Sequence, residues 1–266
     1  MLKLLFYELP FKSNFIKTLY FNFRVFPFSV AMKFPVRVIG RAKLIGLRKG
    51  CVELKHDDTP SFSIQLGVVA FDSTLTTQLK FSRGATLAVG KNVRIHGGAN
   101  ISVNENAKLT LGDDVLFNHN VFLACSNEMT IGNHVRFGWN VQVTDSDFHV
   151  LYDSEKKEFL APWGTVKIGD YVWIGNHSSI SKRSVVPSHS IVSSYSLVNK
   201  DLSGAGESGC LFAGIPAKCK KSGIHRMFDA SLDKHIQGMF NGSPSLPFDA
   251  LDEETKKKFQ ELHYQY

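Results

Sequence analysis

The chain has 266 residues with a hydrophobic share of 43% and a charged share of 21%, which excludes wholesale disorder and indicates one large globular domain with appendages. It contains no apolar run of about 18 residues, so no membrane-spanning helix is expected, and its first residues, interrupted by Glu8 and Pro10, make a poor secretory signal. The net charge of +7 permits an acidic partner but does not choose among nucleic acid, a phosphorylated cofactor and a membrane surface.

Residues 1–35 form an aromatic and basic segment. They contain eight Phe, two Tyr and five Lys or Arg, against one acidic residue, Glu8. A pair of amphipathic helices here would cap the open end of a coiled fold, whose end strand needs cover. An aromatic and cationic surface would also suit an anionic bilayer, as a peripheral contact at the inner face of the membrane. We expect the cap, because every solenoid needs one, and leave the membrane contact open.

A six-residue repeat occupies the middle of the chain. Residues 168–203 read IGDYVW, IGNHSS, ISKRSV, VPSHSI, VSSYSL and VNKDLS, with an aliphatic residue first and mostly a small residue fifth in each. The same register appears upstream in three sets of three, namely Val89, Ile95 and Ile101, then Leu111, Phe117 and Leu123, then Ile131, Phe137 and Val143. Weaker traces place the start of the repeat near residue 36.

Each set of three hexads predicts one turn of a triangular coil, in which the first residue points inward and the fifth fits a tight corner. The glycines that follow the inward residues are expected at bends, and these are Gly90, Gly112, Gly132, Gly169 and Gly175. Stacked turns about 4.8 Å apart would form three parallel sheets around an apolar column. The repeat also places Ile180 inward and Lys182 outward, so a substitution of Lys182 should matter little.

The six-residue repeat stops after Val143 and resumes at Ile168. Residues 144–167 are too long for a corner and rich in polar and aromatic residues, and such extruded loops are usually functional. The loop carries Asp145, Asp147 and His149 close together at its start. A neutral imidazole can take a proton from a hydroxyl, and a nearby carboxylate can fix its tautomer. A solvated acidic loop and a DxDxH metal site are the alternatives, but no further ligand is spaced to complete a metal site.

Three other motifs accompany the repeat. IGDYVWIG follows the loop and carries Trp173, FNHNVFLA precedes it and carries Asn118 and Asn120, and LFAGIPAKCKK ends the coil with Lys218 and Lys221. Gly and Pro in the last motif predict a rigid turn, after which the lysines offer cations to phosphate groups. A plain outer aromatic residue and a solvated basic tail are the structural alternatives.

Together these motifs resemble the left-handed β-helix, or hexapeptide-repeat, acyltransferases over roughly residues 36–220. The likeness is to sugar and polysaccharide O-acetyltransferases of the galactoside, maltose and capsule type. The resemblance implies the left hand of the coil, which periodicity does not give. It also implies acetyl coenzyme A as co-substrate, no metal, and a homotrimer with active sites between neighbouring subunits.

The resemblance further implies roles for individual residues. His149 matches the general base that opens the extruded loop, and from their position beside it Asp145 or Asp147 is expected to orient it. Trp173 matches a tryptophan that lines the pantetheine channel, with Gly175 and Ser179 beside it. Lys218 and Lys221 match the basic end of that channel, and Asn120 matches an asparagine that touches the acceptor sugar, although Asn118 could replace it.

The C-terminal residues 221–266 predict a helical extension. LDEETKKKFQELH has acidic residues early and lysines later, the order that the helix dipole favours, and NGSPSLPF before it is a linker. The domain organisation expected is therefore a cap over 1–35, a β-helix over 36–220 and this extension. The four scattered cysteines, with no CxxC pair, predict free thiols in a reducing cytoplasm and no structural zinc.

The sequence thus predicts an all-β dominated left-handed parallel β-helix that transfers acetyl from acetyl coenzyme A to a sugar hydroxyl of a glycan or glycan precursor. The partners expected are coenzyme A, a carbohydrate acceptor and further copies of the chain, and not nucleic acid. An N-acyltransferase on an amino sugar nucleotide and a non-catalytic β-helix scaffold are the alternative functions.

Overall fold

The computed structural model describes residues 14–68, 75–205 and 209–263. The chain divides into two compact units, Met1–Ile224 and His225–Tyr266. The first unit contains the predicted coil and the second the predicted C-terminal extension.

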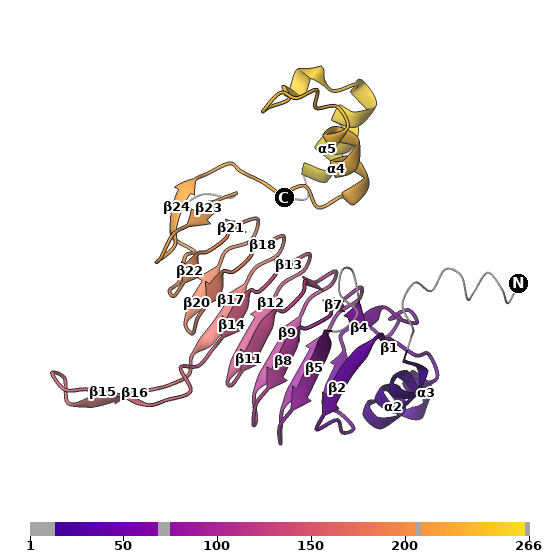
Figure 1. Ribbon diagram of the computed structural model, residues 1–266, viewed down its shortest axis with the longest axis vertical. Coiled ribbons are helices and arrows are strands. Elements are labelled where there is room, and N and C mark those ends of the chain that lie inside the picture. Colours follow the sequence, from indigo (N-terminus) through magenta and orange to yellow (C-terminus); the bar gives the residue numbers. More distant parts are fainter. Residues whose placement is uncertain (1–13, 69–74, 206–208, 264–266) are drawn as a thin grey trace, which may run out of the picture. The chain divides into compact units, whose positions relative to one another are not determined.

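The first unit is a coil of parallel strands that visits three sheets in turn (Figure 1). The first sheet contains β1 (Val36–Val38), β4 (Ile64–Val68), β7 (Arg94–His96), β10 (Leu116–Phe117), β13 (Arg136–Phe137), β18 (Trp173–Ile174), β21 (Ile191–Val192), β23 (Leu211–Ala213) and the antiparallel β24 (Lys218–Lys221). The second sheet contains β2 (Arg41–Ile45), β5 (Thr76–Phe81), β8 (Asn100–Val103), β11 (Phe122–Cys125), β14 (Gln142–Thr144), β19 (Ser179–Ile180) and β22 (Leu197–Val198). The third sheet contains β3 (Val52–Leu54), β6 (Thr86–Val89), β9 (Lys108–Leu111), β12 (Glu128–Ile131), β17 (Thr165–Ile168) and β20 (Ser184–Val186).

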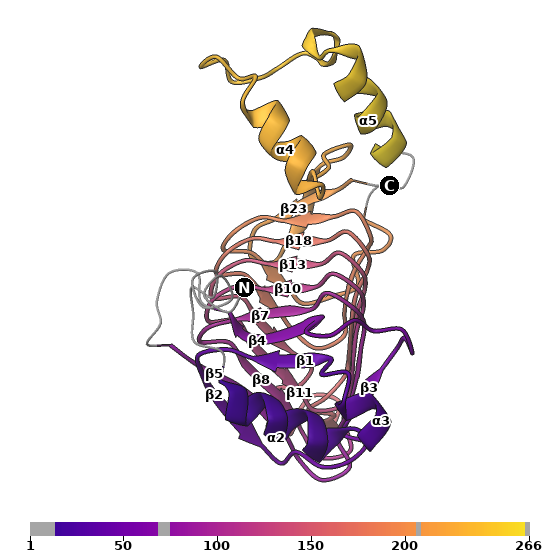
Figure 2. The same cartoon turned by 90° about the vertical axis from the view of Figure 1, so that its right-hand side faces the viewer.

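The coil is left-handed. In Figure 2 the first sheet faces the viewer, β2 lies to its left and β3 to its right, and the coils rise from β1 to β23. A chain that rises while it passes from the front to the left, and then behind to the right, winds left-handed. The predicted fold class, a left-handed parallel β-helix with helical segments at both ends, is confirmed.

An apolar column fills the coil, in the register that the repeat predicts. All fifteen inward residues have at most 3% of their surface exposed, namely Val89, Ile95, Ile101, Leu111, Phe117, Leu123, Ile131, Phe137, Val143, Ile168, Ile174, Ile180, Val186, Val192 and Val198. Strand pairing stacks them directly, as with Phe117 on Phe137, whose rings are parallel and 4.7 Å apart. Burial of this continuous column is the main stabilising term of the fold.

The corners differ from the prediction in one respect. The bend is made by a residue two positions after the expected glycine, and Asp114, His134 and Tyr171 there adopt left-handed φ angles of 52°, 56° and 55°. The glycine itself is required by close stacking: a Cβ on Gly112 would meet the carbonyl group of Gly132 in the next coil at 2.5 Å. Polar and ring side chains therefore line the corners in columns.

Helices α2 (Phe15–Val25) and α3 (Phe28–Ala31) cover the open end of the coil, as expected of a cap (Figure 2). Phe21 and Val25 on the inner face of α2 join the core cluster. The Asn22 amide donates to Val36 O at 2.7 Å and accepts from Val36 N at 3.2 Å. The Thr18 hydroxyl likewise accepts from Val38 N at 3.0 Å. These two side chains occupy the hydrogen-bonding groups that a further strand would otherwise take.

The second unit contains α4 (Ala230–Gln237), a 3₁₀ turn (Phe248–Ala250) and α5 (Glu253–His263). Helix α5 falls in the predicted LDEETKKKFQELH segment, with Glu253 and Glu254 in its first turn. Helix α4 was not predicted. Within the described residues of the whole chain, no helix has the length and hydrophobicity to cross a membrane.

Candidate active site

The extruded loop leaves the coil where the second sheet gives way to the third. Strand β14 ends at Thr144, β17 begins at Thr165, and between them β15 (Leu151–Asp153) and β16 (Glu158–Leu160) form an antiparallel hairpin that projects from the coil (Figure 1). In a three-sided coil this corner lies opposite the first sheet. The loop therefore points away from the face that carries Trp173.

Asp145 fixes the start of the loop to the coil. Its carboxylate is fully buried and accepts from Ser126 N at 2.6 Å and from Asn127 N at 2.8 Å, with the Cys125 thiol at 3.6 Å. Burial raises the pKa of Asp145, against the opposite effect of the two backbone donors. The carboxylate thus joins the loop to the turn between β11 and β12, which is a structural role.

Asp147 forms an ion pair with Lys182, which lies in the next coil. Lys182 Nζ is 2.5 Å from Asp147 Oδ2 and also donates to Ala161 O at 2.9 Å, so one ammonium group holds both sides of the loop. Backbone bonds from Asp147 N to Pro162 O and from Gly164 N to Asp145 O, each 2.8 Å, close the same base. Lys182 points outward as predicted and also binds the loop, because the next corner lies directly beside the loop base.

His149 lies between the hairpin and the base of the loop, which Asp145 and the Asp147–Lys182 pair hold in place, and its side chain is exposed. It follows Phe148, whose left-handed φ of 62° is supported by a bond from its N–H to Ser146 Oγ. Among the described residues, no hydrogen bond joins His149 to Asp145 or Asp147 and no group of three or more His, Cys, Asp or Glu is placed to hold a metal. The imidazole is therefore open to a substrate, and the two nearby carboxylates serve the loop.

Trp173 lies on the outer face of the first sheet, where it begins β18 and has 40% of its surface exposed. Gly175 and Ser179 follow it toward the second sheet. A Cβ on Gly175 would meet Ser194 N at 2.5 Å, so the stacking of the next coil explains this glycine. Ser179 begins β19 and is half-buried. The structure thus brings these three residues onto one coil, on the side away from the loop.

Asn118 and Asn120 occupy the same corner as Gly175, two coils earlier. Asn118 Oδ1 accepts from the N–H of His119 at 2.9 Å. Asn120 is exposed and adopts a left-handed φ of 58°, a conformation that asparagine tolerates. Both residues therefore contribute to the local geometry of the corner. This corner joins the first sheet, which carries Trp173, to the second, whereas the loop leaves between the second and third sheets.

Lys218 and Lys221 are exposed on β24, at the edge of the first sheet. The sheet order β18, β21, β23, β24 puts three strand spacings, about 14 Å, between Trp173 and these lysines. An aromatic side chain and a cationic end are thus arranged along one sheet. The Gly214–Ala217 segment is the turn between β23 and β24.

The prediction of four free thiols is wrong. Cys210 and Cys219 form a disulfide with Cα atoms 6.0 Å apart, whereas Cys51 and Cys125 are free and buried. The antiparallel return of β24 along β23 brings together two residues nine positions apart, which the absence of CxxC could not reveal. Cysteine content therefore no longer supports a reducing compartment.

Two groups of corner residues were missed. His134, Tyr171 and His189 stack in successive coils beside Trp173, with ring centroids 4.5 and 5.2 Å apart. Asp114 accepts from His134 Nδ1 at 3.0 Å and pairs with Arg136, the strand neighbour of Trp173. These residues could have been found in the sequence, because a ring or polar residue recurs at the same corner position of each coil.

The second missed group is a pair of histidines beside Asn118. The rings of His96 and His119 lie 5.2 Å apart, and His119 Nδ1 is 3.1 Å from Gly97 O. Burial lowers the pKa of His96 to about 4, and the neighbouring His119 and Arg94 act in the same direction.

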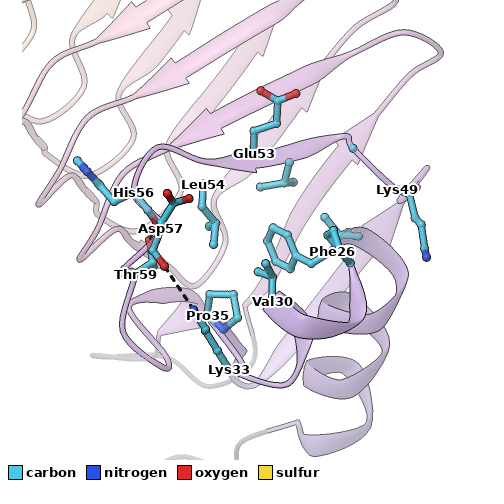
Figure 3. A pocket seen from close by; sticks show the side chains of 14 residues that line it. Phe26, Val30, Lys33, Pro35, Lys49, Glu53, Leu54, His56, Asp57 and Thr59 are labelled. Atoms are coloured by element: carbon cyan, nitrogen blue, oxygen red, sulfur yellow. Dashed lines mark hydrogen bonds between the residues drawn. The ribbon is translucent and has the colours of Figure 1, made fainter.

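A cavity of about 510 Å³ lies between the cap and the first coil (Figure 3). Phe26, Val30 and Leu54 form apolar walls, and Lys33 and Lys49 lie at its rim. None of the predicted site residues lines this cavity, so it is not the predicted active site.

No protein-family model matches the chain, and no curated protein matches it. Among solved structures, the polySia-specific acetyltransferase NeuO is 20% identical with a TM-score of 0.48, over 86% of this chain and 99% of that chain. A hexapeptide-repeat acetyltransferase of Vibrio cholerae, complexed with acetyl coenzyme A, is 28% identical with a TM-score of 0.36, over 42% and 59% of the two chains. A mutant of AntD, an N-acyltransferase from Bacillus cereus, is 14% identical with a TM-score of 0.44, over 86% and 98%.

Because each of these TM-scores lies below 0.5, an activity for this chain has to come from its own residues. Acetyltransferases and an N-acyltransferase are thus among the solved structures that match this chain.

Proposed function

We propose that this protein is an acetyl-coenzyme-A-dependent O-acetyltransferase that acts on a sugar hydroxyl of a glycan or glycan precursor, of the capsule or exopolysaccharide type. The observation that carries the proposal is the clamped loop. Asp145 and the Asp147–Lys182 pair fix its base to the coil, and the loop holds the exposed imidazole of His149 outside a closed solenoid. A scaffold has no need of so many polar bonds at one interruption of its repeat.

His149 is the general base of the proposed reaction. Its neutral imidazole takes the proton from the acceptor hydroxyl as the hydroxyl oxygen attacks the thioester carbonyl, and then returns this proton to the departing thiolate. Both substrates are bound together, and no acyl-enzyme is needed. Asp145 and Asp147 act on this step only through the position of the loop, since their carboxylates bind elsewhere.

Coenzyme A is proposed to lie along the outer face of the first sheet. The exposed Trp173 indole offers an apolar surface for the pantetheine arm, and Lys218 and Lys221, about 14 Å farther along the sheet, offer cations to the phosphates. Asn118 and Asn120, at the corner two coils earlier, are proposed to contact the acceptor sugar.

A second copy of the chain is proposed to complete the site. His149 leaves the corner opposite the first sheet, whereas Trp173 faces outward from that sheet, so one copy presents the two groups on different sides. In a homotrimer with head-to-tail contacts, the loop of one copy lies against the first sheet of the next.

Release of free thiol from acetyl coenzyme A, with a panel of sugars and glycans as acceptors and mass detection of the acetylated product, tests the reaction. His149→Ala should lower turnover by about a hundredfold or more, the usual contribution of a general base. His235→Ala removes another exposed histidine, in the second unit, and should have little effect. Near-normal turnover of His149→Ala would remove His149 from the mechanism, and acetylation of amino sugar nucleotides alone would favour N-acyl transfer.

Calorimetric titration with coenzyme A tests the binding face. Trp173→Ala should raise the dissociation constant by roughly ten- to a hundredfold, which corresponds to about 1–3 kcal/mol of lost apolar contact. Lys218→Ala with Lys221→Ala should weaken binding less, and this loss should shrink at high salt. Failure of the unaltered protein to bind at millimolar concentration would contradict the proposed activity, whereas equal binding by Trp173→Ala would remove only this placement of the coenzyme.

Mixing two impaired variants tests the shared site. A trimer assembled from His149→Ala and Trp173→Ala subunits contains interfaces that carry both native residues, so co-refolded mixtures should regain activity at low coenzyme A concentration. No regain, with trimers shown by light scattering, would place both residues in one subunit's site.

A further inference from the structure

We propose that the outer face of the N-terminal cap is a binding surface for anionic lipid bilayers. The inner face of α2 is used to close the coil, through Phe21, Val25, Asn22 and Thr18. The opposite face of α2 takes no part in closing the coil, and its proposed role is independent of acetyl transfer.

The outer face is apolar and exposed. In α2, Ile16, Tyr20 and Phe23 recur at spacings of four and three residues, so they share a face of the helix that the coil does not cover. Ile16 has 78% of its surface exposed, and Phe28 at the start of α3 has 72%. Phe15 and Met32 are also exposed. Large side chains gathered in this way mark an interaction surface rather than ordinary scatter.

Aromatic contacts continue this surface beyond the helices. The Phe23 ring lies 6.0 Å from both Phe28 and Phe34, and Phe34 lies 6.5 Å from Phe62. The guanidinium of Arg37 is 5.7 Å above the Phe62 ring. Aromatic side chains with adjacent cations suit the boundary between lipid headgroups and acyl chains.

The charge of the region identifies the occupant. Residues 14–58 contain nine Lys or Arg against three acidic residues, Glu53, Asp57 and Asp58, which leaves an excess of positive charge. Lys33 and Lys49 lie at the rim of the cavity beside α3, whose lining combines apolar side chains with the carboxylates of Glu53 and Asp57 (Figure 3). A second copy of the chain that used the same face would bring these positive charges against each other, whereas phospholipids with anionic headgroups neutralise them. Charge and apolar exposure therefore favour an anionic bilayer over self-association.

Vesicle flotation of the full chain tests this proposal, with phosphatidylcholine vesicles compared with vesicles that also contain phosphatidylglycerol. We expect binding to the anionic vesicles, weakened by salt, and little binding to the neutral ones. Ile16→Ser combined with Phe28→Ser should lower the partition coefficient by about tenfold or more, since both side chains would enter the interface. Both side chains are highly exposed, so their replacement should leave the fold intact, and unchanged melting of the variant checks this.

Two matched controls distinguish binding through this face from effects of exposed aromatic residues or net charge elsewhere on the protein. Phe159→Ser removes a side chain that is 76% exposed on the hairpin and should leave flotation unchanged. Lys33→Glu with Lys49→Glu should abolish the preference for anionic vesicles, whereas Lys108→Glu with Lys200→Glu alters net charge equally, elsewhere on the coil, and should reduce it much less. Absence of binding, equal binding to both vesicle types, or equal losses in the control variants would overturn the proposal. So would a change in oligomer mass in Ile16→Ser/Phe28→Ser without vesicle binding, which would assign the face to contacts between copies.

Discussion

Removal of the Lys182 ammonium should open the extruded loop without unfolding the coil. Lys182 is 15% exposed and Asp147 38% exposed, so their contact at 2.5 Å is shielded from solvent on the Lys182 side only. The same ammonium holds Ala161 O at 2.9 Å. Lys182→Ala removes both interactions at the loop base and touches none of the residues of the apolar column.

The expected magnitude follows from the two bonds. A hydrogen bond that involves a charged group contributes about 1.5–3 kcal/mol, and the partial exposure of Asp147 favours the lower end. A loss of about 2 kcal/mol corresponds to a roughly 30-fold rise in the population of the open loop. Hydrogen exchange at the amides of Asp147 and Gly164, which close the base, should accelerate by this factor while the melting temperature changes little. Turnover should fall, because His149 depends on the loop for its position.

Lys200→Ala is the matched control, since Lys200 occupies the corresponding corner position one coil later and is exposed. It should change neither exchange in the loop nor turnover. If Lys182→Ala leaves the exchange of Asp147 and Gly164 at the native rate, Lys182 does not clamp the loop. If exchange accelerates but turnover is unchanged, the loop position is irrelevant to the activity.

Three further outcomes are expected. Ile180→Asp buries an unpaired charge in the column and should cost several kcal/mol, whereas Lys200→Glu should leave the melting temperature almost unchanged, and equal melting of the two would contradict the register. Because burial lowers the pKa of His96 from 6.5 to about 4, stability should be full above pH 6.5 and fall by up to about 3 kcal/mol as the pH drops toward 4. His96→Gln should lose less over that interval in denaturant titrations, and an identical pH profile would contradict the shift. Reduction of the Cys210–Cys219 disulfide should cost about 2–3 kcal/mol, as expected for a short closed loop, and an unchanged denaturation midpoint would contradict a structural role.

The column of the coil could be predicted from the sequence because each hexad repeats the same physical requirement. An inward position such as Ile174 or Val192 meets only its counterparts above and below, so period alone determines burial. The presence of a cap was predictable for the same reason. The way in which the cap covers the edge strand could not be predicted. The side chains of Asn22 and Thr18 bond to that strand, and such tertiary contacts leave no trace in the six-residue repeat.

The partners of the loop residues could not be predicted, because proximity in sequence is a poor guide to contact in a solenoid. Asp145 is four residues from His149 but binds the backbone of Ser126 and Asn127, one coil earlier. Asp147 binds Lys182, which is 35 positions away. In each case the neighbour is a corner residue of an adjacent coil, and the interrupted repeat hides how those coils align.

The same geometry supports the proposal that the loop serves a neighbouring copy rather than its own coil. His149 and Trp173 are 24 positions apart in the sequence, and one coil separates them along the axis, yet a complete side of the triangle lies between the corner of the loop and the first sheet. A loop meant to cover its own Trp173 would leave the coil at an edge of the first sheet. Its departure from the opposite corner, with a base fixed by Asp145 and Lys182, directs His149 outward. A rigid base and an outward histidine suit the proposed site between copies, because such a loop would have to keep its direction before the copies meet.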